Sequence, residues 1–182
     1  MKRLLVVVDF QNDFVDGPLG FPKAASFYPR VKELISEFED SRDEVVFTRD
    51  VREDDYLHTE EGRNLPIPHC LRGTPGARFY GDLEEMASAH RVFEKGTFGS
   101  EALLDYLKKG AYREIVLCGL DLSICVIANA IIAKTAAPNA HIVVDLSASG
   151  SGDREAEGHA IAALRRLEIE TIDGTSKKGI IF

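Results

Sequence analysis

Short apolar runs alternate along the chain with longer stretches in which apolar residues recur at helical spacing. Residues 4–8, LLVVV, form a continuous aliphatic run that ends at Asp9, as a central parallel strand buried on both faces does. Runs of the same kind predict strands over residues 44–48, 91–94, 115–118, 141–145 and 168–172, the last at an edge of the sheet.

The stretches between the strands carry the pattern of amphipathic helices. Their apolar faces are formed by Val31, Leu34, Ile35 and Phe38, by Leu103, Leu104 and Leu107, and by Ile161 and Leu164. Gly110 ends the second of these helices. A further apolar helix follows Gly119 with Ser123 as its cap, and Ser151 or Asp153 is expected to cap the last helix.

Strands that alternate with helices at this spacing indicate right-handed βαβ units. The expected fold is a three-layer α/β/α sandwich with a mainly parallel, Rossmann-like sheet. A chain of 182 residues is long enough for one well-buried domain and short for two, so we expect a single domain over residues 1–182. Residues 51–90, where periodicity fades, are expected to form a long active-site loop or insertion, and the tail to Phe182 has no assignment.

Composition narrows the class of partner. The net charge of −8 provides no basic patch, which argues against nucleic acid or an anionic membrane and favours a small molecule. The three cysteines include no CxxC pair, so they indicate neither a disulfide framework nor a thiolate zinc site, and they suit a reducing cytoplasm. The first apolar run stops at Asp9, which is too early for a signal peptide or a membrane span.

Polar residues follow several predicted strands, and the carboxyl ends of parallel strands meet at one edge of a sheet. These residues are Asp9, Asp50, Lys95, Asp121 and Asp145. Cys125 lies in the first turn of the helix after Gly119, where the helix dipole is expected to lower the pKa of a thiol toward neutrality. The alternative is a buried cysteine with no reactivity, as most lone cysteines are.

An acid, a lysine and a cysteine at one edge suit nucleophilic catalysis. Asp9 would accept the proton of Cys125, and Lys95 would stabilise both anions. Gly119 allows the sharp turn that presents backbone N–H groups to an oxyanion, as acyl transfer through a thioester requires. The pattern favours amide hydrolysis, and a purely structural ion pair between Asp9 and Lys95 is the alternative.

Three segments resemble one known family, and they occur in the order VVVDFQNDF, FEKGTFGS and CGLDLSICV. This order resembles the isochorismatase-like superfamily, and in particular its nicotinamidase-related cysteine hydrolases. The resemblance covers nearly the whole chain and implies a catalytic triad of Asp9, Lys95 and Cys125. It also implies a cis peptide between Leu120 and Asp121, with the Asp121 and Cys125 amides as the oxyanion hole. True isochorismatases lack the cysteine, so Cys125 excludes that branch.

The resemblance implies hydrolysis of a small carboxamide through a cysteine thioester. Nicotinamide is the leading substrate, and carbamoyl or ureido compounds are the alternatives; no organic cofactor is implied, and relatives commonly form homodimers or larger homo-oligomers. Phe14, Tyr56 and Leu120 are candidates for the substrate pocket, although the aromatic residues would equally pack the loop against the sheet. A non-catalytic domain of receiver type is the alternative from another class, with Asp50 accepting phosphate and Cys125 inert.

Nicotinamidases of this family bind a divalent ion, often zinc, through an Asp-x-His pair, a further His and, in some relatives, a Glu. Asp50, Glu61 and His69 match that pattern, but residue 52 is arginine instead of histidine. Arginine stays protonated and opposes a cation beside it, and Asp50 would alternatively form an ion pair with Arg52. Three ligands still hold zinc in an open catalytic site, and His58 is a substitute ligand or a solvated loop residue. A divalent metal, zinc before other ions, is therefore an expectation that Arg52 opposes.

Overall fold

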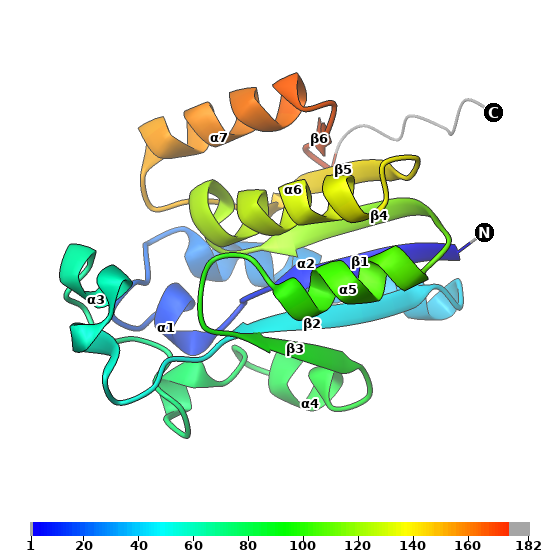
Figure 1. The fold of residues 1–182 in the computed structure, drawn as a ribbon. Coiled ribbons are helices and arrows are strands. Elements are labelled where there is room, and N and C mark those ends of the chain that lie inside the picture. The colour runs from blue at the N-terminus through cyan, green and yellow to red at the C-terminus, as the bar shows by residue number, and fades with distance from the viewer. Residues whose placement is uncertain (1, 175–182) are drawn as a thin grey trace.

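Six parallel strands form the centre of the computed structural model, which describes residues 2–174 (Figure 1). The strands are β1 (Lys2–Val8), β2 (Glu44–Asp50), β3 (Arg91–Lys95), β4 (Tyr112–Gly119), β5 (His141–Ser149) and β6 (Glu170–Ile172). Their order across the sheet is β3-β2-β1-β4-β5-β6, and each neighbouring pair is parallel. β1 lies between β2 and β4, which explains why its run of aliphatic residues is buried on both faces.

One face of the sheet is covered mainly by α2 (Tyr28–Asp40), which lies behind the sheet in Figure 1. The predicted apolar face of this helix packs on the strands through Val31, Leu34, Ile35 and Phe38. Three short helices add to this layer: α1 (Asn12–Val15), η1 (Ala24–Phe27) and α4 (Leu83–Ala87). The amphipathic pattern therefore identified the helix and the face it buries.

The other face is covered by α5 (Glu101–Lys109), α6 (Ile127–Ala136) and α7 (Arg154–Arg166). Figure 1 shows α5 and α6 on the near side of the sheet. Their buried apolar residues form one core with the strands: Leu103, Leu107, Ala130, Ala133 and Leu164. Helices on both faces of a parallel sheet confirm the predicted three-layer α/β/α sandwich.

β5 continues four residues beyond the predicted end, so Asp145 lies inside the strand and not at the edge where Lys95 lies. Pairing of Gly119 with Ser149 keeps the backbone extended past the aliphatic run. The buried Asp145 carboxylate lies 3.2 Å from Arg30 of α2 and accepts from the Ser147 amide at 2.9 Å. The prediction that Asp145 joins the polar cluster is wrong, because α2 supplies its cation.

The last predicted strand is shorter than expected. β6 begins at Glu170 because Glu168 has a left-handed backbone, with φ of 59°, which an extended strand does not accommodate. It pairs with β5 at the edge of the sheet, as predicted. The tail to Phe182 lies outside the described residues.

Residues 51–90 contain four short helices: η2 (Tyr56–His58), α3 (Glu60–Asn64), η3 (Pro75–Ala77) and α4. Two isolated bridges, Arg52 to Leu71 and Gln11 to Phe79, fix this segment to itself and to the end of β1. The predicted loop is therefore anchored on the sheet edge. The assignment of residues 1–182 to a single domain stays a prediction. No helix within residues 2–174 is long and apolar enough to cross a bilayer.

Candidate functional site

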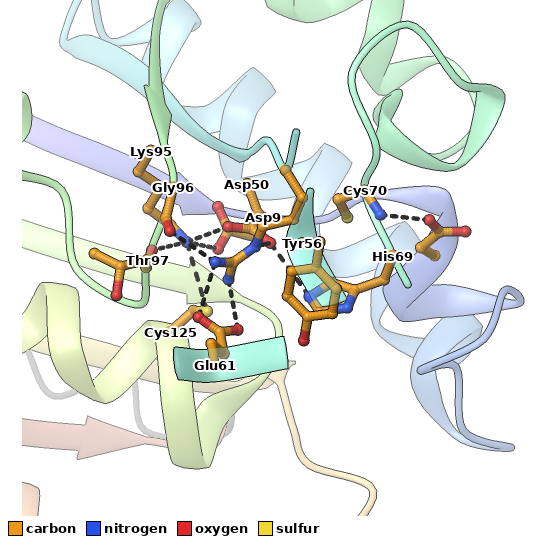
Figure 2. A network of polar contacts seen from close by, with 12 residues as sticks. Asp9, Asp50, Tyr56, Glu61, His69, Cys70, Lys95, Gly96, Thr97 and Cys125 are labelled. Carbon is orange, nitrogen blue, oxygen red and sulfur yellow. Dashed lines mark hydrogen bonds and ion pairs between the residues drawn. The ribbon is translucent and has the colours of Figure 1, made fainter. Parts of the chain in front are cut away.

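The carboxyl ends of β1, β2 and β3 bring two acids and a lysine together (Figure 2). Lys95 Nζ lies 2.6 Å from Asp9 Oδ2 and 3.4 Å from Asp50 Oδ1, and it donates to the Thr97 carbonyl at 2.8 Å. All three charged side chains are buried. Burial opposes the charged form of Lys95, but the carboxylates of Asp9 and Asp50 outweigh it and raise the pKa of Lys95. The lysine is therefore a permanent cation.

The sulfur of Cys125 completes this group, because Sγ lies 3.6 Å from Lys95 Nζ. Cys125 is 5% exposed, and burial raises the pKa of its thiol well above the usual value. The charge of Asp9 raises that pKa further, while Lys95 opposes the rise. The predicted lowering of the pKa toward neutrality is wrong, because burial has the largest effect on this thiol and Asp9 and Asp50 add to it. The resting group is a thiol that needs a base.

Asp9 has the position and the proton affinity of such a base. Its Oδ1 accepts a hydrogen bond from Thr48 Oγ1 at 2.7 Å. Its Oδ2 lies 2.6 Å from the Lys95 ammonium but accepts no well-aligned hydrogen bond from a described residue. Burial raises the pKa of Asp9, and the nearby Asp50 adds to the rise, although Lys95 lowers it. A carboxylate with a raised pKa takes up a proton more readily than an exposed aspartate does.

The turn from β4 into the Cys125 segment depends on Gly119. Its φ is 126°, and a Cβ there would lie 1.9 Å from the Val8 carbonyl oxygen, so β1 and β4 approach too closely for any side chain. The Leu120–Asp121 peptide that follows is cis, as the resemblance implied. This turn brings the Asp121 backbone to the carboxyl edge of the sheet, beside the segment that holds Cys125.

Asp121, and not Ser123, caps that segment. Asp121 Oδ1 accepts from the Ser123 amide at 2.8 Å and from its hydroxyl at 2.7 Å. The cap opens a π-helical turn, η4 (Leu122–Val126), which holds Cys125 and continues into α6. The predicted Ser123 cap is wrong, because the chain turns two residues earlier. Asp153 caps α7, whereas the Ser151 hydroxyl donates to Asp121 Oδ2 at 2.9 Å.

Asn129 is a positioning residue that the sequence analysis missed. Its Nδ2 donates to the carbonyls of Cys125 at 2.8 Å and Phe98 at 3.0 Å, and its Oδ1 accepts from the Ser100 amide at 3.0 Å. The side chain is fully buried, so it fixes the Cys125 turn to the loop that follows Lys95. The signal was present in the sequence, because an asparagine four residues after Cys125 interrupts the otherwise apolar run of residues 124–133.

Asn129→Ala is expected to lower the free energy of unfolding by about 2 kcal/mol or more, because the buried amide of Ser100 and the part-buried carbonyl of Phe98 lose their partner. Turnover should fall with it, since the Cys125 turn is released. Urea denaturation measures the free energy of unfolding, and initial rates measure the turnover. Asn64→Ala is the matched control, because that exposed side chain donates only to the Glu60 carbonyl, and it should change stability by less than about 0.5 kcal/mol. Equal stability of the two variants would contradict the role of Asn129.

A cavity of about 670 Å³ lies beside this group. Its lining includes residues next to Lys95 and Cys125 and residues of the anchored 51–90 segment: Val51, Arg52, Tyr56, Gly96, Thr97, Phe98 and Ile124. Tyr56 borders this cavity, and its contact with substrate stays a prediction. Phe14 packs against His69 with ring centroids 5.7 Å apart, and Leu120 lies in the apolar core. Neither borders the cavity, so their contact with substrate stays a prediction.

Arg52 lies between the residues proposed as metal ligands. Its Nε donates to Asp50 Oδ2 at 2.9 Å, and its two terminal nitrogens donate to the two oxygens of Glu61 at 2.8 and 2.7 Å. His69 Nε2 lies 3.6 Å from the same Asp50 oxygen, and His58 is exposed. Among residues 2–174 no group of three or more His, Cys, Asp or Glu side chains is arranged to hold a metal. As arranged, Asp50, Glu61 and His69 do not fit a metal ion.

Asp50 is equally unsuited to accept phosphate. Its carboxylate is wholly buried, with Lys95 at one oxygen and Arg52 and His69 at the other. Burial would raise the pKa of Asp50, but the hydrogen bond with His69 and the charges of Lys95 and Arg52 lower it. A receiver-type phosphorylation site needs an accessible aspartate, so that alternative is wrong.

Comparison with known proteins places this geometry in context. Residues 3–176 match the model described as the Isochorismatase domain. The chain is 29% identical over 187 residues to the nicotinamidase/pyrazinamidase of Mycobacterium tuberculosis, covering 94% of this chain and 97% of that protein. The pyrazinamidase of Pyrococcus horikoshii, solved in complex with zinc, has a TM-score of 0.82 and 26% identity, covering 95% of this chain and 99% of that chain. N-carbamoylsarcosine amidase from Thermoplasma acidophilum has a TM-score of 0.79 and 27% identity, covering 98% and 100%.

Proposed function

Because this chain belongs to the isochorismatase family and is an amidohydrolase of it, we propose that it hydrolyses a small carboxamide through a thioester on Cys125, with nicotinamide as the leading substrate. The observation that carries the proposal is the contact of Cys125 Sγ with Lys95 Nζ, 3.6 Å apart, while the same ammonium lies 2.6 Å from Asp9. A thiol and a base that share one fixed cation are the groups that formation of a thioester needs.

In the proposed reaction the sulfur of Cys125 attacks the amide carbon, and its proton passes to the Asp9 carboxylate. Lys95 stabilises the sulfur anion as it forms, and the backbone N–H groups of Asp121 and Cys125 stabilise the oxyanion. Asp9 then returns the proton to the leaving nitrogen, and ammonia departs. Water, with its proton taken by Asp9, attacks the thioester, and the carboxylic acid is released as the Cys125 thiol re-forms.

The pH dependence of turnover follows from the raised pKa of Asp9. The base must be deprotonated, so kcat/KM should fall as the pH drops through that pKa, which lies above the value of about 3.9 for an exposed aspartate. Rates measured across a pH series, with folding checked by circular dichroism at each pH, test this expectation. An acid limb at or below the ordinary aspartate pKa would contradict it.

The identity of the substrate is tested by measuring ammonia release from a panel that includes nicotinamide, pyrazinamide and N-carbamoylsarcosine. We expect kcat/KM for nicotinamide to exceed that for N-carbamoylsarcosine by about 100-fold or more, since a difference of that size reflects a pocket built for one of them. The reverse order would favour the carbamoyl alternative, which the fold similarity to N-carbamoylsarcosine amidase supports. A homodimer or larger homo-oligomer and a cytoplasmic location stay predictions.

A further inference from the structure

The guanidinium of Arg52 is held from three sides in the interior of the site. Besides its bonds to Asp50 and Glu61, its Nη1 donates to the Gly96 carbonyl at 2.7 Å, directly after Lys95 in the chain. The residue is 6% exposed. Glu61 therefore receives a two-pronged ion pair, which is the geometry that arginine provides and lysine does not.

The negative charge of the surrounding carboxylates explains why a cation is needed at the position of Arg52. Asp9, Asp50 and Glu61 place three carboxylates around the site, and Lys95 alone would leave two of their charges uncompensated. Buried carboxylates without a cation are strongly unfavourable. A divalent cation would compensate such charges, and the pyrazinamidase of Pyrococcus horikoshii was solved in complex with zinc. In this chain the guanidinium already meets Asp50 and Glu61 together, so their oxygens face an organic cation.

We propose that Arg52 takes the place that a divalent ion would hold, and that this enzyme operates without a bound metal. The role of Arg52 in catalysis rests on the proposed amide hydrolysis. Whether a metal ion or Arg52 occupies the position between Asp50 and Glu61 does not depend on it. Arg52 then acts as a positioning residue, because it holds Asp50 against Lys95 and the Gly96 carbonyl beside it. Since Arg52 also borders the cavity, substrate meets an N–H donor on that wall and not a Lewis acid.

The test is the zinc content of the wild-type protein and of Arg52→His, measured by elemental analysis after incubation with zinc and removal of unbound ions. Wild-type protein should retain less than about 0.1 zinc per chain, and chelation should leave its activity unchanged. In Arg52→His, the new imidazole joins Asp50, Glu61 and His69, so the variant should retain about one zinc per chain. Zinc should also raise its melting temperature and not that of the wild type.

Arg63→His is the matched control, because Arg63 is an exposed residue of α3 that pairs only with the exposed Glu60 and the His58 carbonyl. It should bind no more zinc than the wild type, which separates the site from adventitious binding. About one zinc per wild-type chain, or a folded Arg52→His without zinc, would overturn the proposal. If Arg52→His does not fold, calorimetric titration of the wild type with zinc decides the question alone, and neither measurement depends on whether the protein hydrolyses amides.

Discussion

Cys125→Ala is expected to reduce amide hydrolysis by about 10⁴-fold or more while the protein stays folded, as loss of a catalytic nucleophile does. Cys125 supplies the only sulfur within residues 2–174 that contacts the Lys95 ammonium, so no other thiol replaces it. The substitution removes one buried atom from a small side chain, which leaves the fold largely unaffected. Steady-state ammonia release and thermal unfolding measure the two expectations.

The matched controls are Cys70→Ala and Cys118→Ala. Both thiols are fully buried, and burial raises the pKa of each as it does for Cys125, but only Cys125 among the described cysteines has its sulfur against the Lys95 ammonium. Each variant should retain turnover within about threefold of the wild type, because neither sulfur contacts the triad. If Cys125→Ala retains more than about a tenth of the wild-type activity, the assignment of the nucleophile is refuted. Loss of activity in a folded Cys70→Ala or Cys118→Ala would refute it as well.

Asp9→Asn is expected to lower kcat by about 10² or more with little change in KM, because an amide has no proton affinity in this range. Lys95 keeps Asp50 at 3.4 Å, so the ammonium retains a partner and the site retains its shape. The acid limb of the pH profile should disappear along with the activity. A full pH series of kcat and KM for the variant separates loss of the base from weaker binding.

Asp16→Asn provides the comparison for Asp9→Asn, since Asp16 is an exposed acid that follows α1. Its kcat, KM and pH profile should match those of the wild type. Near-wild-type turnover in Asp9→Asn would assign Asp9 a structural role only, as a partner that keeps Lys95 charged.

The fold could be predicted from the sequence because the spacing of apolar residues reflects which positions are buried. The aliphatic run in β1 predicted a central strand, and the apolar stripe of α2 predicted the face that the helix buries. The same reasoning located Asp9, Asp50 and Lys95 at adjoining strand ends, because parallel strands share a carboxyl edge. These inferences need only local patterns and general rules of topology.

Features that depend on contacts across the fold could not be predicted in this way. Asp145 appeared to end a strand, but Arg30, 115 residues earlier in the chain, supplies its cation and leaves it away from the site. The pKa of Cys125 depends on burial and on Asp9, neither of which helical position reveals. The expectation that Arg52 opposes a metal stays a prediction, and its ion pair with Glu61 emerges only from the folding of residues 51–90.

The thioester itself is tested most directly by rapid acid quenching of the wild-type enzyme during turnover of nicotinamide, followed by mass spectrometry of its peptides. We expect a nicotinoyl group on the peptide that contains Cys125, which disappears as substrate is exhausted and is absent from Cys125→Ala. An acyl group on Cys70, on Cys118 or on any other residue would contradict it.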